Sequence, residues 1–204
     1  MMLMMLRRLV RARLGVPVAD DFFTDDVLDD HINLAIQHIE SENHWPWSDV
    51  VDQVTITPDA ADFPLPPAYR ATRSIFDNDT ELSQVAPSDL LTYTTVKGQL
   101  PRVWCPMADV IAVRPAPGSA TCLTHYWYRQ PAWLSRDIDA PAIPDQFTGA
   151  IIAKASELMS SREGAGADTA RHRDEYQDWI GLMRHEVRRT TMPTRVRVRR
   201  GGWI

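Results

Sequence analysis

The first part of the chain has the hydrophobic periodicity of two helices. Aliphatic side chains recur every three or four residues over 3–14, and Gly15 supplies a stop. Thr24 is a suitable N-cap for the second helix, because its hydroxyl can accept a backbone N–H and the aspartates that follow favour the positive end of the helix dipole. An aliphatic stripe then continues to Ile39, so the pattern predicts that this helix ends near 42–43.

The middle of the chain changes to a pattern typical of strands. Its segments are rich in β-branched and aromatic residues, and clusters of Pro, Gly, Asn and Asp separate them. The predicted strands cover 50–56, 69–76, 81–85, 102–113 and 120–129. Short strands joined by tight turns predict an antiparallel sheet or a small barrel rather than a parallel sheet with crossover helices. A helix of one or two turns is expected at 87–91.

Helical spacing returns in the last third of the chain. Pro144 suits the first position of a helix whose apolar face runs to Met159. A Gly-rich turn at 164–166 leads into another helix over about 168–188, and the two are expected to pack antiparallel. Arginine and valine then alternate over 194–200, which is a strand pattern on a piece too short and too basic to fold alone.

Together these patterns predict an α+β protein. The expected fold is a helical body of two N-terminal and two C-terminal helices, with a small antiparallel β region in the central part of the chain and an extended C-terminal arm. We expect one domain over 1–190, with the N-terminal helices in 1–45, the β region in 48–134 and the C-terminal helices in 143–190. Residues 191–204 form the arm in this prediction.

Composition narrows the class of protein. The chain has 204 residues, 22 basic and 27 acidic side chains, a formal net charge of −5 and 44% hydrophobic residues. That length suits one compact domain, and an acidic balance argues against nucleic-acid binding over the whole surface. Two cysteines, Cys105 and Cys122, exclude a disulfide framework and a four-thiolate zinc site, so we expect a reducing compartment and two small buried side chains. No apolar run approaches the roughly 20 residues that span a bilayer.

The charges are sorted along the chain. Residues 15–69 contain twelve acidic side chains and no Lys or Arg, whereas 184–204 contain seven arginines and one acid. Of the 22 basic residues, 20 are arginines, whose planar guanidinium suits fixed contacts with carboxylates and phosphates. Such segregation is typical of a protein that docks onto others.

Motifs for catalysis are missing from the sequence. It has no Gly-rich phosphate loop, no His-Glu-x-x-His, no nucleophile elbow and no Cys-x-x-Cys, so we expect neither an enzyme nor a cofactor. Two acidic pairs, at 25–26 and 29–30, could offer carboxylates to a metal, but a solvated helix N-terminus is the favoured interpretation. His31 and His38 share a helical face without a third ligand at matching spacing, so exposed or interface histidines are favoured over a metal site.

The aromatic residues allow two interpretations. Trp45, Trp47, Trp104, Trp127 and Trp133 lie in or beside the predicted strands or after a helix. Packing in a core or hairpin is favoured over a stacking platform for single-stranded nucleic acid. A platform needs basic residues between the aromatic ones, and the most aromatic stretch has only one arginine beside it.

The arm also has two interpretations. As a nucleic-acid arm it would bind phosphates with a strong salt dependence. As a protein-docking arm it would add a strand to a partner's sheet, and its alternating valines and apolar end favour this choice. The predicted apolar anchors are Val196, Val198, Trp203 and Ile204, and the predicted charge contacts are Arg195, Arg197, Arg199 and Arg200.

Four stretches carry a resemblance to a known family. "LRRLVRARLGVP…DDFFTDDVLDDHINLAIQHI" (Leu6–Ile39) resembles the "R..LG" helix and the following "f.d..l...iN.a...i" helix of tailed-bacteriophage head–tail adaptor proteins, also called head-completion or connector proteins. "FPLPPAYRATRSIF" (Phe63–Phe76) resembles their "ypLP.df.r..sv" strand. "VIAVRPAPGSATCLTHYWYRQPAWL" (Val110–Leu134) resembles their hairpin, and "IPDQFTGAIIAKASELM" (Ile143–Met159) resembles their next helix. The arginine-rich tail after Pro193 is outside the shared pattern.

The resemblance implies a structural virion protein. Members of this family form a ring, usually of twelve subunits, that binds the portal protein at the capsid vertex and extends the DNA channel. They offer a docking surface to the tail or stopper protein, and genomic DNA passes without sequence-specific binding. The expected location is the head–tail junction of the virion, which is assembled in the host cytoplasm. No membrane is expected among the partners. On this view a C-terminal extension docks into the portal. Four acidic residues are expected to lie either at the interface between subunits or at the DNA channel, and they are Asp25, Asp26, Asp29 and Asp30.

Overall fold

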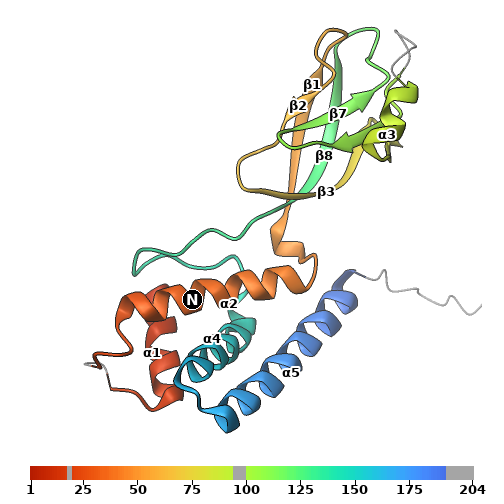
Figure 1. Ribbon diagram of the computed structural model, residues 1–204. Coiled ribbons are helices and arrows are strands. Elements are labelled where there is room, and N and C mark those ends of the chain that lie inside the picture. Colours follow the sequence, from red (N-terminus) through yellow and green to blue (C-terminus); the bar gives the residue numbers. More distant parts are fainter. Residues whose placement is uncertain (18–19, 94–99, 192–204) are drawn as a thin grey trace, which may run out of the picture. The chain divides into compact units, whose positions relative to one another are not determined.

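The structure is a computed structural model that describes residues 1–17, 20–93 and 100–191 of the chain. It divides into two compact units. The helical unit contains residues 1–43 and the described residues from 133 onward, and the β unit contains residues 44–132. The α+β class predicted from the sequence is confirmed (Figure 1). Of the predicted arm, residues 191–204, Thr191 is the last residue of a helix, and residues 192–204 lie outside the described residues.

The helical unit has four α-helices and one 3₁₀ turn in its described part. These are α1 (Leu3–Leu14), α2 (Asp25–Glu42), η3 (Asp145–Phe147), α4 (Thr148–Glu163) and α5 (Gly166–Thr191). The first two match the predicted helices, and the Thr24 hydroxyl accepts the Val27 N–H at 3.4 Å as the expected N-cap. The prediction for Pro144 is wrong: it is extended and precedes the 3₁₀ turn, so the α-helix begins only at Thr148.

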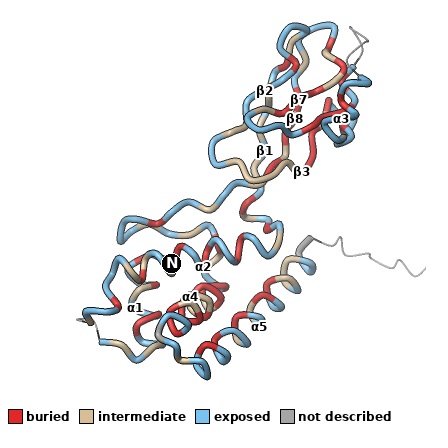
Figure 2. Tube along the Cα trace, viewed as in Figure 1, coloured by how far each residue is buried: buried red, intermediate tan, exposed pale blue. Residues whose placement is uncertain are grey.

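Helix α4 forms the centre of the helical unit. It packs against α1, α2 and α5, and no residue of 148–160 is exposed (Figure 2). Small side chains allow this close packing. At Gly149 a Cβ atom would lie only 2.2 Å from the ring of Trp179 on α5, so glycine lets the indole approach the helix backbone.

The β unit contains two four-stranded sheets. Its elements are η1 (Pro46–Ser48), β1 (Asp49–Ile56), β2 (Phe63–Pro64), β3 (Tyr69–Asp77), β4 (Thr80–Glu81), β5 (Ser83–Gln84), α3 (Pro87–Leu90), η2 (Leu91–Tyr93), β6 (Val103–Pro106), β7 (Val110–Arg114) and β8 (Thr121–Arg129). One sheet has the order β1-β8-β3-β4 and the other β2-β7-β6-β5. All pairs are antiparallel except β5 with β6, which is parallel.

Two of the predicted strands are divided in the structure. The segment 102–113 forms β6 and β7, because the chain turns at 107–109 and the Met107 N–H donates to the Val110 carbonyl at 2.8 Å. The segment 81–85 is shared between β4 and β5, which belong to different sheets. The short helix expected at 87–91 is confirmed as α3.

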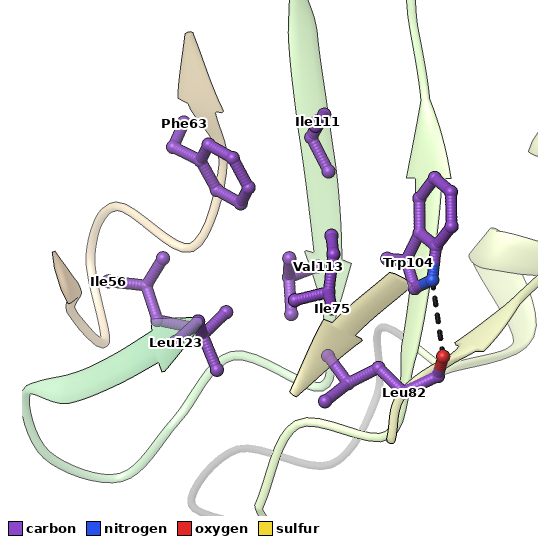
Figure 3. Close-up of a cluster of buried hydrophobic side chains, with 8 residues drawn as sticks. All are labelled: Ile56, Phe63, Ile75, Leu82, Trp104, Ile111, Val113 and Leu123. Carbon is purple, nitrogen blue, oxygen red and sulfur yellow. Dashed lines mark hydrogen bonds between the residues drawn. The ribbon is translucent and has the colours of Figure 1, made fainter. Parts of the chain in front are cut away.

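A hydrophobic core joins the two sheets of the β unit. Its buried members come from both sheets and are Ile56, Phe63, Ile75, Leu82, Trp104, Ile111, Val113 and Leu123 (Figure 3). The indole N–H of Trp104 donates to the carbonyl of Leu82 at 3.2 Å, so the large ring is buried without leaving its donor unsatisfied. Core packing is thus confirmed for Trp104, and Trp127 is buried as well, with its indole N–H donating to Asp52 at 2.7 Å.

Two expectations of burial are wrong. Cys105 is buried, but Cys122 is exposed, because alternate residues of β8 from Leu123 onward face the core and Cys122 lies on the opposite face. Trp133 has an exposed fraction of 52%, since it lies beyond the last strand in an irregular segment.

A histidine lies inside the β unit. His125 is only 1% exposed, its Nε2 atom lies 2.9 Å from the Thr72 hydroxyl, and aromatic rings surround it. Burial lowers the pKa of His125 to about 4, and the nearby Asp52 carboxylate opposes this shift only in part. The imidazole is therefore neutral at pH 7 and stays neutral in mild acid.

We expect this histidine to make the stability of the β unit depend on pH. Between its unfolded pKa of 6.5 and its folded pKa of about 4, the unfolded chain binds a proton that the folded β unit does not bind. The free energy of unfolding should therefore fall as the pH decreases through this window, by about 3 kcal/mol in total. Hydrogen exchange of β3 and β8 at pH 7, 6 and 5 measures the change. His125→Gln should lose this slope, and an equal slope in both proteins would contradict the assignment.

Candidate interaction site on the helical unit

The start of α1 is capped by a distant part of the chain. No side chain caps this helix at Met2. Instead, the N–H groups of Leu3 and Met4 donate to the carbonyls of Asp139 and Asp137, at 2.8 and 3.2 Å. These are donors that a helix leaves free in its first turn, so the segment that returns from the β unit completes the helix.

Asn33 holds the same returning segment against α2. Its side chain is buried, with only 2% of the residue exposed. The amide nitrogen donates to the carbonyls of Asp29 and Leu134, both at 2.9 Å, and the amide oxygen accepts the Leu134 N–H at 2.8 Å. One side chain thus satisfies both backbone groups of Leu134, and we call this arrangement the Asn33 clamp.

Arg7 connects α1 with α2 and the returning segment. Its Nε and Nη2 atoms donate to the two carboxylate oxygens of Asp29, at 2.5 and 2.6 Å, and Nη1 donates to Asp137 at 2.7 Å. The side chains of Arg7 and Asp29 are only 12% and 15% exposed. The hydrogen bond to Asp29 raises the pKa of the guanidinium, burial opposes this rise in part, and the hydrogen bond to Asp137 raises the pKa further. The contact is a bidentate and largely buried charge pair, which is the strong form of a hydrogen bond between ionised groups.

Arg11 fixes the turn between α1 and α2. Its Nη2 atom donates to the carbonyl of Phe23 at 2.9 Å, and Nη1 lies 2.8 Å from an Asp25 oxygen. Gly15 ends α1 with a left-handed backbone (φ +68°), and its N–H donates to the Arg11 carbonyl. The "R..LG" pattern therefore has a physical basis: arginine anchors the turn, and glycine adopts a conformation that other residues rarely adopt.

The four predicted acids divide into two pairs. Asp25 and Asp29 bind arginines of α1 within the helical unit. Asp26 and Asp30 are exposed, and neither has a hydrogen bond or ion pair with the described residues. The predicted arm residues lie outside the described part of the chain.

The two histidines of α2 lie apart from these contacts. His31 Nδ1 is 2.7 Å from the Val27 carbonyl, one turn earlier in the helix, and His38 is exposed. Among the residues that the structure describes, no three His, Cys, Asp or Glu side chains gather as a metal site would require.

A groove runs beside α1 on the outside of the helical unit. It has a volume of 490 Å³, and its lining combines apolar side chains with charged ones, among them Met4, Arg8, Arg11, Val16 and Asp25. The Nε atom of Arg11 is buried and has no partner among the described residues. The groove continues into an exposed apolar face of α1, on which Met4, Met5 and Leu9 have exposed fractions of 55%, 48% and 37%.

Sequence analysis missed the residues that hold this region together. Asn33 had a local signal, since it is an amide within the aliphatic stripe of α2, beside Ile32. Arg7 had none, because its partners Asp29 and Asp137 are 22 and 130 residues away in the sequence. The exposed methionines Met4 and Met5 lie outside the aliphatic stripe on which the prediction of that helix depends, so the stripe did not reveal them as a separate face.

The described residues therefore present exposed charged and apolar helix faces, which are typical of a structural protein that binds other proteins. Comparison with protein families points to the same class. The chain belongs to the SU10 adaptor protein family, which it matches over residues 5–199, and it is a phage head–tail adaptor protein. The resemblance inferred from the sequence is thereby confirmed.

The family match bears on several of the expectations drawn from the sequence. The family is structural, and the protein is a component of the phage particle. The match extends to residue 199, so the expectation that the family pattern ends at Pro193 is wrong. A comparison with curated proteins gave no match. Within the described ranges, no helix combines the length and apolar character needed to cross a membrane.

Proposed function

We propose that this adaptor assembles as a ring of twelve copies on the portal protein at the capsid vertex. The ring extends the DNA channel and presents a docking surface to the tail or stopper protein, and it has no enzymatic activity. Membership of the adaptor family over nearly the whole chain carries this proposal. The division into a helical unit and a β unit also supports it, because a ring subunit needs separate surfaces for its neighbours and for its partners.

The C-terminal arm is the proposed contact with the portal. Four arginines alternate with valines in residues 195–200, and Trp203 and Ile204 add apolar side chains. In this proposal the arm adds a strand to a sheet edge of the portal, with valines in pockets and arginines at acidic groups. The arm follows directly on α5, which ends at Thr191.

The exposed acids of α2 are the proposed contact between ring subunits. Asp26 and Asp30 suit this role better than Asp25 and Asp29, because the latter two already bind Arg11 and Arg7. Opposite charges on two different faces of a subunit fix the order and orientation of neighbours in a ring.

Deletion of residues 192–204 tests the arm. We expect the truncated protein to keep its circular dichroism spectrum, since the deletion begins after α5, and to lose at least about 100-fold in affinity for the portal. Titration of the portal with each protein measures the loss. A truncated protein that binds the portal at full affinity would show that the arm is not the contact.

Two matched variants of the full chain separate the contributions within the arm. One replaces the four arginines by glutamine, and the other replaces Val196, Val198 and Trp203 by serine. A loss of portal affinity in both supports docking of the arm on protein. Tight binding of duplex DNA by the wild type, with a steep salt dependence that only the arginine variant removes, would favour the nucleic-acid arm instead.

A further inference from the structure

The helical unit leaves charges of opposite sign exposed on two different helices. On α1, Arg7 and Arg11 bind aspartates of α2, and Arg13 binds Glu175. Arg8 is exposed and has no hydrogen bond or ion pair with any described residue. Among the described residues, Arg8 is the only arginine of α1 that is exposed without such a partner.

Arg8 lies in the middle of an apolar face. At 100° per residue, Met4 and Ala12 are one turn before and one turn after Arg8, and Met5 and Leu9 lie beside them. All four of these neighbours are exposed, and the groove of 490 Å³ borders the same face. Methionine side chains are flexible and polarisable, and they adapt to an apolar partner surface. We call this surface the α1 face.

A complementary surface lies on α2. Asp26, Asp30 and Leu34 follow one another at intervals of four residues, so they form one stripe on the side of the helix opposite the core. Leu34 has an exposed fraction of 41%, although it follows two buried residues. The stripe therefore carries two free carboxylates next to an apolar side chain. We call it the α2 stripe.

We propose that the α1 face of one copy binds the α2 stripe of a second copy. Arg8 then lies between Asp26 and Asp30 of the neighbour, and Leu34 of the neighbour packs against the methionines and into the groove. This inference rests on the proposed ring, and it names the two surfaces that join its subunits.

Charge decides between the three ways in which two copies can pair. Contact of α1 with α1 places Arg8 against Arg8, and contact of α2 with α2 places four carboxylates together. Only the α1–α2 pairing brings opposite charges into contact. Because the two surfaces differ, this pairing is head-to-tail, and repeated head-to-tail contacts close into a ring when the rotation permits.

Disulfide cross-linking of the full chain tests the pairing directly. Leu9→Cys and Leu34→Cys are introduced together in a Cys122→Ser background, because Cys122 is the exposed native cysteine and Cys105 is buried. We expect oxidation to give a ladder of dimers, trimers and larger products that collapses on reduction. Each single variant should give no ladder. Dimers from the Leu9→Cys variant alone would show α1 against α1 and overturn the pairing.

Charge reversal gives a second test. Arg8→Asp and Asp30→Arg should each raise the concentration needed for half-assembly by about 10- to 100-fold, and the protein carrying both should recover most of the loss. Arg171→Asp, on the exposed side of α5, is the control and should leave assembly unchanged. Sedimentation velocity measures assembly, and thermal unfolding verifies that every variant is folded.

The outcomes separate this inference from the proposed ring. Rings that form normally in both single variants would overturn the α1–α2 contact and leave the ring intact. If rings still form normally but Arg8→Asp no longer binds the portal or the tail protein, the α1 face is instead the binding surface for the protein whose binding is lost. A wild-type protein that stays monomeric at every concentration, and that binds the portal only as separate single copies, would overturn both the proposed ring and the α1–α2 contact.

Discussion

Replacement of Asn33 by aspartate is expected to lower the free energy of unfolding of the helical unit by about 4 kcal/mol. The side chain keeps its shape, but the carboxylate cannot donate to the carbonyl of Leu134, and a buried carbonyl left unsatisfied costs roughly 1–3 kcal/mol. The carbonyl of Asp29 keeps its place in the hydrogen bonds of α2, but a buried carboxylate held beside both carbonyl oxygens adds the cost of an uncompensated charge. Chemical denaturation followed by helical circular dichroism measures the change. Because the substitution changes one atom type and no volume, cavity formation does not contribute.

The pH dependence of this variant gives an independent check. Burial next to two carbonyls raises the pKa of the introduced carboxyl in the folded state above its unfolded value. The folded variant therefore binds a proton more readily than the unfolded chain, so its deficit relative to the wild type should shrink as the pH falls towards 4. Gln37→Glu makes the same change of amide to acid at an exposed position of α2 and should cost less than about 0.5 kcal/mol. A deficit below about 1 kcal/mol in Asn33→Asp would contradict the Asn33 clamp.

Replacement of Arg7 by methionine is expected to cost about 3 kcal/mol or more. It leaves Asp29, which is only 15% exposed, without the guanidinium that binds both of its oxygens. Arg7→Lys should recover only part of the loss, because an ammonium group cannot make the two parallel hydrogen bonds. The effect should persist at high salt, since a partly buried pair is screened much less than an exposed one.

A double-mutant cycle isolates the pair. Arg7→Met and Asp29→Asn together should cost clearly less than the sum of the two single changes, because the second change removes the charge that the first one strands. The exposed pair of Arg171 and Asp168 on α5 is the matched control, and its coupling should be below about 1 kcal/mol and vanish in salt. Equal coupling energies for the two pairs would show that burial adds nothing at Arg7.

Local sequence patterns were sufficient to predict the helices that bury one continuous apolar stripe. Helices α1 and α2 were placed correctly because each buries one stripe along its length, and because Gly15 marks the end of α1 and Thr24 the start of α2. The start of α4 was misplaced because Pro144 fits both the beginning of a helix and the extended residue before a 3₁₀ turn. The sequence around it is compatible with both geometries.

The β unit was harder to predict because its pairing is not local. The alternation of β8 was visible, but which of its faces is buried depends on the second sheet that covers it, and this determines that Cys122 is exposed. The division of 102–113 into β6 and β7 requires a turn at 107–109, which Pro106 before it and Asp109 within it favour. These two residues were an insufficient signal, because the apolar residues on both sides also fit one continuous strand.

The sequence indicated the acidic residues of the candidate site but not the contacts that they make. The acids of α2 were noted, but their division into bound and free pairs depends on the arginines of α1 and on the way the two helices pack. Charge counts could not distinguish Arg7 from Arg8, although they are adjacent in the sequence and differ fully in their surroundings.

The cap of α1 also sets an order of events during synthesis. Residues 137–139, which complete the first turn of α1, and α4, which covers the buried sides of α1 and α2, leave the ribosome more than 100 residues after α1 begins. The β unit has all of its strands by residue 129. Domains generally fold as units as they emerge. The β unit therefore folds first. Until residues 137–139 and α4 have been synthesised, the apolar stripes of α1 and α2 remain exposed to solvent.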